Sequence, residues 1–105
     1  APTLSFLDLN RAMPLVEASL EEIYRKLRLP PSENITLKDQ FHCCHMIERL
    51  ISKEPLNYPR LKSFVNAHSK AFRVVGEALQ PVAQTFGIRI PTSETAYRVE
   101  IFLAM

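Results

Sequence analysis

The chain has 105 residues, of which 47% are hydrophobic and 23% are charged. This length is typical of one domain, and such a chain buries enough surface to fold without a disulfide or a structural metal. The formal net charge of +2 is too small for the concentrated basic surface of a nucleic-acid-binding protein, so direct contact with nucleic acid is not expected.

Hydrophobic periodicity predicts helices throughout, and hairpin signals such as Asn-Gly are absent. The first helix is expected over residues 10–27. The prolines at 30 and 31 end it, because a proline disfavours helical geometry in the residue before it. The second is expected over residues 37–53, with Thr36 as its N-cap. Its inward face is interpreted as the apolar stripe of Leu37, Phe41, Cys44, Ile47 and Ile51.

Proline and glycine divide the second half of the chain. A short helix is expected after Pro59. A longer helix is expected over residues 69–86, with a kink at Pro81, which removes a backbone hydrogen bond, and with Gly87 as its left-handed terminator. The last helix is expected to begin after Pro91. The sequence therefore predicts an all-α, five-helix bundle with two antiparallel helix pairs and a short peripheral helix.

Location and domain organisation follow from what the chain contains. No apolar run approaches the ~20 residues needed to span a bilayer, and no basic and then apolar leader is present. We therefore expect a soluble, cytoplasmic protein that does not contact a membrane. The chain begins at Ala1 without an initiator Met and ends at Met105 inside an apolar helical pattern. We expect residues 1–105 to be a single helical domain of a longer protein.

The second predicted helix carries the polar residues that are most capable of chemistry. His42, His45 and Arg49 are spaced three and four residues apart, so they project along one stripe beside the inward face. A neutral imidazole is a nucleophile at physiological pH, and a guanidinium can bind the oxygens of an incoming phosphoryl group. From spacing alone, a pair of boundary histidines beside a surface arginine is the commoner explanation.

Other residues indicate no cofactor, metal or catalytic site. Cys43 and Cys44 are neighbours on one helix, so their side chains diverge, and we expect buried thiols rather than a disulfide. Together with His42 and His45 they cannot surround a tetrahedral ion from one short stretch of helix. A nucleophile elbow and a phosphate-binding glycine loop are both missing, so no enzyme activity is expected. His68 is expected only to cap or solvate the short helix.

Three stretches together resemble a PTS regulation domain (PRD), the helical module through which the sugar phosphotransferase system controls bacterial transcription factors. They are FHCCHMIERL at 41–50, FGIRIP at 86–91 and ETAY at 94–97. In this family a phosphorylatable histidine stands seven residues before an arginine on the second helix. His42 and Arg49 match these two positions.

The resemblance is closest to LevR-like activators of the enhancer-dependent sigma factor, and less close to the RNA-binding antiterminators. Antiterminator domains usually have an aspartate where Phe41 stands and a second histidine where Ile101 stands. One phosphorylation site, His42, is therefore implied. The resemblance implies that Arg49 stabilises the phosphate or orients His42. His45 has no role in the family pattern, but it shares the stripe and is placed with Arg49 at the phosphate site.

The resemblance also implies a function. A phosphoryl group from HPr or from a sugar-specific EIIB would be accepted by His42, and the domain would associate as a homodimer. The added charge could shift an equilibrium between dimer arrangements only if one of them accommodates that charge better. The domain would be a substrate of phosphotransfer, not a catalyst, and would control a transcriptional activator.

Two other functions remain open at this point. In the first, the bundle is a non-phosphorylated dimerisation or docking module and His42 is incidental. A His42 that faces a groove would favour the switch, whereas full burial with both ring nitrogens engaged would favour the scaffold. The second is a helix-turn-helix DNA-binding protein, which is disfavoured because Arg98 is the only Lys or Arg in the last helix.

Overall fold

The computed structural model describes residues 7–105, which form six helices and no strand. The helices are α1 (Leu9–Leu27), α2 (Glu33–Ile51), α3 (Leu61–Ala67), α4 (Ser69–Ala78), α5 (Gln80–Phe86) and α6 (Thr92–Leu103). The predicted all-α class is confirmed. No helix in the described part of the chain combines the length and the hydrophobicity that a membrane span requires.

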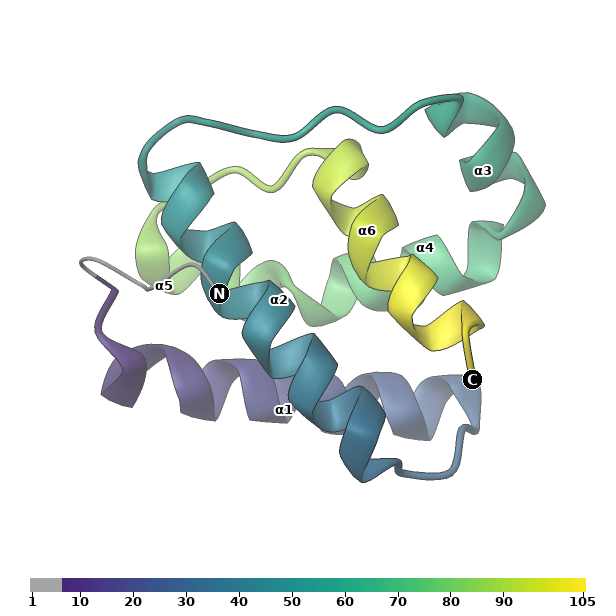
Figure 1. Cartoon of the computed structure of the whole chain (residues 1–105), viewed down its shortest axis with the longest axis horizontal. Coiled ribbons are helices and arrows are strands. Elements are labelled where there is room, and N and C mark those ends of the chain that lie inside the picture. The colour runs from purple at the N-terminus through teal and green to yellow at the C-terminus, as the bar shows by residue number, and fades with distance from the viewer. Residues whose placement is uncertain (1–6) are drawn as a thin grey trace.

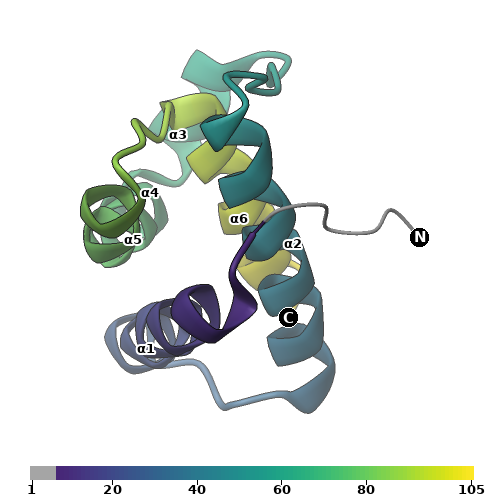
Figure 2. The same ribbon diagram turned by 90° about the vertical axis from the view of Figure 1, so that its left-hand side faces the viewer.

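The long helices form two antiparallel pairs that cross each other (Figure 1). α1 runs against α4, and α2 runs against α6. Turning the molecule shows the two pairs as separate layers, with α1, α4 and α5 on one side and α2 and α6 on the other (Figure 2). α3 lies at the edge, where it contacts α4 and α6. The predicted arrangement of two antiparallel pairs and a short peripheral helix is therefore confirmed.

α2 begins earlier than expected, at Glu33 rather than at residue 37. The N-cap is Ser32, whose hydroxyl accepts a hydrogen bond from the Ile35 N–H at 3.3 Å. The predicted cap, Thr36, lies inside the helix, and its hydroxyl oxygen is 3.1 Å from the hydroxyl oxygen of Tyr24. The two consecutive prolines before Ser32 explain why the chain is extended up to that residue.

The helix predicted over residues 69–86 is present as two helices, α4 and α5, which are separated at Leu79. Pro81 has no amide hydrogen to donate, so the series of helical hydrogen bonds is interrupted where the kink was predicted. The Ala83 N–H still donates to the carbonyl of Leu79 at 3.0 Å, which keeps the two helices connected. Gly87, with a φ of 63°, ends α5 in the left-handed conformation, as predicted.

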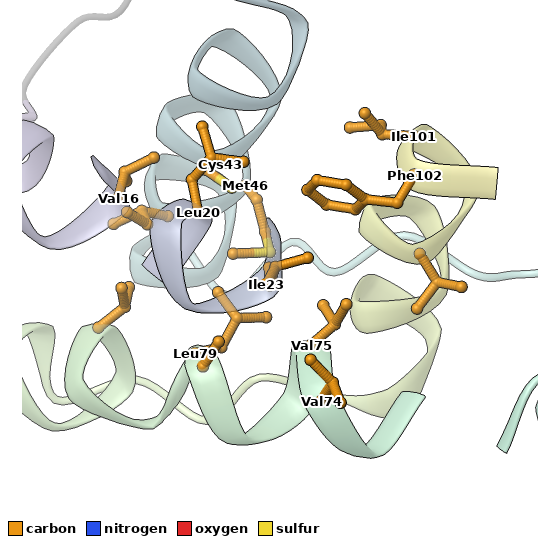
Figure 3. Close-up of a cluster of buried hydrophobic side chains, with 14 of the residues drawn as sticks. Val16, Leu20, Ile23, Cys43, Met46, Val74, Val75, Leu79, Ile101 and Phe102 are labelled. Atoms are coloured by element: carbon orange, nitrogen blue, oxygen red, sulfur yellow. The ribbon is translucent and has the colours of Figure 1, made fainter. Parts of the chain in front are cut away.

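One hydrophobic core fills the space between the two layers (Figure 3). It is built from the facing sides of α1, α2, α4 and α6, with Val82 added from α5. Its labelled members in Figure 3 are Val16, Leu20, Ile23, Cys43, Met46, Val74, Val75, Leu79, Ile101 and Phe102. Burial of these side chains holds the crossing pairs together, because apolar surface removed from water is the main favourable contribution to folding.

The inward face of α2 differs from the predicted one. Cys44 and Ile47 are buried as expected, but Leu37, Phe41 and Ile51 are 61%, 52% and 39% exposed. The prediction was therefore wrong for three of the five stripe residues. The other buried residues of α2 are Ile35, Asp39, Cys43, Met46 and Leu50.

Candidate functional site

An open groove of about 610 Å³ follows one side of α2. Its walls are formed by Lys38, Phe41, His42, His45, Glu48 and Arg49 of α2 and by Ile101 of α6. The structure thus brings His42, His45 and Arg49 together on one surface, as their spacing along a helix indicated.

His42 is half-buried in the wall of this groove, and its Nε2 is buried without a hydrogen-bond partner. Desolvation by burial lowers the pKa of His42, and it outweighs the nearby carboxylate of Asp39, which acts in the opposite direction. The positive charges of Arg49 and Arg98 lower the pKa further. The imidazole is therefore neutral at neutral pH, and one of its ring nitrogens carries a lone pair.

Arg49 reaches from α2 to α6 and pairs with Glu94. Its Nη2 donates to Glu94 Oε1 at 2.7 Å, whereas its Nε is buried without a partner. The Glu94 side chain is fully buried, and its second oxygen, Oε2, accepts a hydrogen bond from the Leu56 backbone N–H at 2.7 Å. A single buried carboxylate therefore holds the groove arginine with one oxygen and the connection between α2 and α3 with the other.

A second ion pair joins α2 to α6 in the interior. Arg98 donates from Nε to Asp39 Oδ1 and from Nη2 to Asp39 Oδ2, both at 2.8 Å. The Ser19 hydroxyl oxygen of α1 accepts a further hydrogen bond from Arg98 Nη2 at 2.8 Å. Because Asp39 lies one helical turn before His42, the pair contributes to the electrostatic surroundings of the imidazole.

The roles of Asp39, Glu94 and Arg98 were not predicted from the sequence. Arg98 was considered only as a lone basic residue of the last helix, yet its side chain is fully buried. Glu94 lies in the first turn of its helix, where an acidic residue is favourable even when exposed. Glu94 and Arg98 are four positions apart, so they lie on one face of α6, but nothing in the local sequence marks that face as buried.

His45 also lines the groove. Its ring packs against the ring of Phe41 with 4.4 Å between the ring centroids and an interplanar angle of 52°. Phe41 is one of the most exposed apolar residues of the described chain. The two rings form an aromatic pair in the wall of the groove that His42 also lines.

The two cysteines are free, buried thiols, as expected. Burial raises the pKa of both thiols, so both are protonated at neutral pH. The Cys43 Sγ donates to Asp39 Oδ1 at 3.7 Å. Within residues 7–105, no three His, Cys, Asp or Glu side chains are grouped to hold a metal ion. His68 separates α3 from α4, and its ring packs edge-on against Phe64.

Comparison with known proteins agrees with this architecture. The PRD domain family matches residues 17–104, a range that includes α2 to α6 and every residue of the groove. The transcriptional regulatory protein DagR of Salmonella typhimurium is 32% identical over 99 residues, which are 93% of this chain and 10% of DagR. The chain therefore spans about a tenth of the length of that curated relative. No solved structure gives a significant match. By the extent of the family match and by its fold, the chain belongs to the PRD domain family.

Proposed function

We propose that this chain is the regulatory domain of a bacterial transcriptional regulator and that phosphorylation of His42 switches it. Membership of the PRD domain family supports the regulatory role, as does the similarity to a transcriptional regulatory protein. The phosphoryl donor is HPr or a sugar-specific EIIB of the phosphotransferase system. The regulator is a cytoplasmic, LevR-like activator, and the domain is a substrate of phosphotransfer rather than an enzyme.

The observation that carries the proposal is the state of His42. Its imidazole has a lowered pKa, has a ring nitrogen with no hydrogen-bond partner and lines a groove together with an arginine. A neutral imidazole with an available lone pair is the form that attacks phosphorus. A histidine that only filled space in a core would be expected to have both nitrogens engaged.

The chemical step is a transfer between two proteins. The lone pair of a His42 ring nitrogen forms a new N–P bond, while the bond that holds the phosphoryl group on the donor breaks. The donor atom keeps the electron pair of that bond, so no oxidant or further reactant is needed. Because Nε2 is enclosed, the imidazole must turn, or the wall that covers it must move, before this nitrogen can react.

Arg49 and His45 assist the transfer in different ways. Arg49 has an unpartnered Nε beside the groove and supplies positive charge to the phosphoryl oxygens. His45 packs against Phe41 in the groove wall and orients the incoming donor and its phosphoryl group. The phosphorylated domain gains about one and a half to two negative charges at the α2 surface. In a homodimer, this charge shifts the equilibrium toward the arrangement that accommodates it better.

The test is intact-mass measurement after incubation with phosphoenolpyruvate, Enzyme I and HPr, with and without a candidate EIIB. The wild-type chain and His42→Ala are treated side by side at neutral or mildly alkaline pH, because phosphohistidine is labile in acid. We expect one phosphoryl adduct on the wild type and none on His42→Ala. An adduct on both proteins would move the site to His45 or His68.

A second candidate function is a dimerisation or docking module without phosphorylation. The enclosure of His42 Nε2 favours it, because an acceptor nitrogen must be reached by its donor. Failure to form an adduct with every matched donor, on a chain that is folded by circular dichroism, would make this second function the better one.

A further inference from the structure

Glu94 is the point where the groove and the connection between α2 and α3 meet. Both of its carboxylate oxygens are engaged at 2.7 Å, one by Arg49 and the other by the Leu56 N–H. Its side chain has no solvent exposure. A buried carboxylate of this kind is stable only while its charge is paired and its oxygens are hydrogen-bonded.

The connection between α2 and α3 depends on α6 for its position. Residues 51–57 are all exposed, and the connection passes over the beginning of α6 (Figure 1). It is held there by the hydrogen bond from Leu56 to Glu94 and by a second one from the Tyr97 hydroxyl to the carbonyl of Asn57. Tyr58 adds a ring contact with Tyr97. Glu94 therefore supplies one of the few anchors of this segment.

Arg49 lines the same groove as His42 while its guanidinium is held by Glu94. Helical side chains lean toward the N-terminus of their helix, which directs Arg49 back toward His42, two turns earlier. A guanidinium binds phosphate most strongly through two parallel N–H groups. The edge formed by Nε and Nη2 has its Nε unpartnered, but its Nη2 is held by Glu94. Two-point binding of a phosphoryl group through that edge would use a hydrogen of the same Nη2, so the phosphoryl oxygens and the Glu94 carboxylate would compete for one guanidinium.

The charges favour such an exchange. A phosphoryl group carries about one and a half to two negative charges, compared with one on the carboxylate. Once Arg49 has left, Glu94 would be a buried anion without a partner, so it must move toward solvent or take up a proton. In either case the hydrogen bond from the Leu56 N–H to the Glu94 carboxylate is weakened or broken.

We propose that Glu94 is a positioning residue that holds Arg49 in the unphosphorylated domain, and that phosphorylation of His42 draws Arg49 away and loosens the connection between α2 and α3 at Leu56. This inference rests on the proposed function, because it needs a phosphoryl group on His42. The structural change that follows phosphorylation would then occur in residues 52–60, the connection between α2 and α3, which lies outside the groove.

The test measures hydrogen exchange of individual backbone amides by NMR, in the unmodified chain and in chain whose adduct on His42 has been verified by mass. Exchange of the Leu56 amide should accelerate by about tenfold or more on phosphorylation, because it loses a hydrogen bond to a charged group. The Ala83 amide, which donates to Leu79 on the opposite layer, is the internal control and should not change.

Two variants separate this role from a merely structural one. In unmodified Arg49→Gln, the Leu56 amide should already exchange faster than in the wild type, because Glu94 has lost its cation. Glu94→Gln should do the same and should also abolish the further response to phosphorylation. Glu22→Gln is the matched control, since it removes a carboxylate that pairs with Lys26 on α1, away from the groove.

The outcomes distinguish the two proposals. If no adduct forms on His42, the proposed function fails, and this inference fails with it. If the adduct forms but Leu56 exchange stays within about twofold of the unmodified rate, only this inference is overturned. It is also overturned, whatever happens at His42, if Arg49→Gln leaves the Leu56 amide as protected as it is in the wild type.

Discussion

Asp39 and Arg98 form a two-point ion pair between α2 and α6, and both side chains are fully buried. The pair explains why α2 is rotated relative to the face that its apolar residues indicated. Turning Leu37 and Phe41 inward would move Asp39 toward the surface and leave the guanidinium of Arg98 without its partner in the interior. Leaving that charge unpaired would cost about 3–5 kcal/mol, which is similar in size to the gain from burying two more apolar side chains.

Asp39→Ala should lower the free energy of unfolding by about 3–5 kcal/mol, because it leaves the buried Arg98 charge uncompensated. The measurement is urea unfolding followed by circular dichroism. The double variant Asp39→Leu with Arg98→Met removes both charges and should recover most of the loss. A decrease below about 1 kcal/mol in the single variant would contradict a buried, paired Asp39.

The two glycines should respond to alanine with opposite signs. Gly87 has a φ of 63°, so Gly87→Ala should destabilise the chain by about 1 kcal/mol through backbone strain alone. Gly76 lies inside α4, where Gly76→Ala should stabilise by about 0.5–1 kcal/mol through helix propensity. An added Cβ meets no atom within 4 Å at either position, so clashes do not obscure the comparison. Thermal unfolding of the two variants measures these effects. Midpoint shifts in the same direction would contradict the predicted opposite signs.

The face of α2 can be tested with two truncations on the same helix. Phe41 is 52% exposed, so Phe41→Ala should change the free energy of unfolding by only about 0.5 kcal/mol. Met46 is fully buried, so Met46→Ala should cost about 2–5 kcal/mol. Denaturant unfolding of the two variants under the same conditions measures the difference. Equal losses, or a larger loss at Phe41, would restore the inward face that the sequence indicated.

His42 should make the folded state less stable at acidic pH. Its pKa in the folded chain is lowered from the ordinary value of 6.5, so the unfolded state takes up the proton first as the pH falls. Its contribution to stability is thus complete above about pH 6.5 and decreases as the pH falls below this value, until the folded imidazole is protonated as well.

His42→Gln isolates this contribution, because glutamine does not titrate. Unfolding free energies of the two proteins are measured at about pH 7.5 and about pH 5. The wild type should lose more stability than His42→Gln over this interval. Parallel losses would show that burial does not lower the pKa of His42.

Local sequence features were sufficient to predict most of the architecture. Pro81 and Gly87 marked the break and the end of the predicted fourth helix because their backbone chemistry acts without tertiary partners. The stripe of His42, His45 and Arg49 was predictable for a similar reason, since helical spacing alone places these residues on one surface. The start of α2 was missed because both Ser32 and Thr36 are good N-caps, and the choice depends on where the extended chain ends.

The polar network between α2 and α6 was not predictable from the same features. Asp39 and Arg98 are 59 residues apart, and Arg49 and Glu94 are 45 residues apart. Local periodicity in the sequence cannot identify an ion-pair partner so far away along the chain. Each of these residues, taken alone, is a normal surface residue of a helix, and only the packing of the two helices turns them inward.

The two ion pairs also determine how α2 and α6 can move. Because two ion pairs join these helices, α2 can neither slide along α6 nor roll over it unless one of the pairs breaks. The Asp39–Arg98 pair is fully buried, whereas Arg49 of the Arg49–Glu94 pair keeps a quarter of its side chain exposed. Of the two pairs between α2 and α6, the Asp39–Arg98 pair is therefore the better shielded from water. His42 lies between the two pairs along α2, so a displacement of the helix at this residue would strain the shielded Asp39–Arg98 pair on one side and the more accessible Arg49–Glu94 pair on the other.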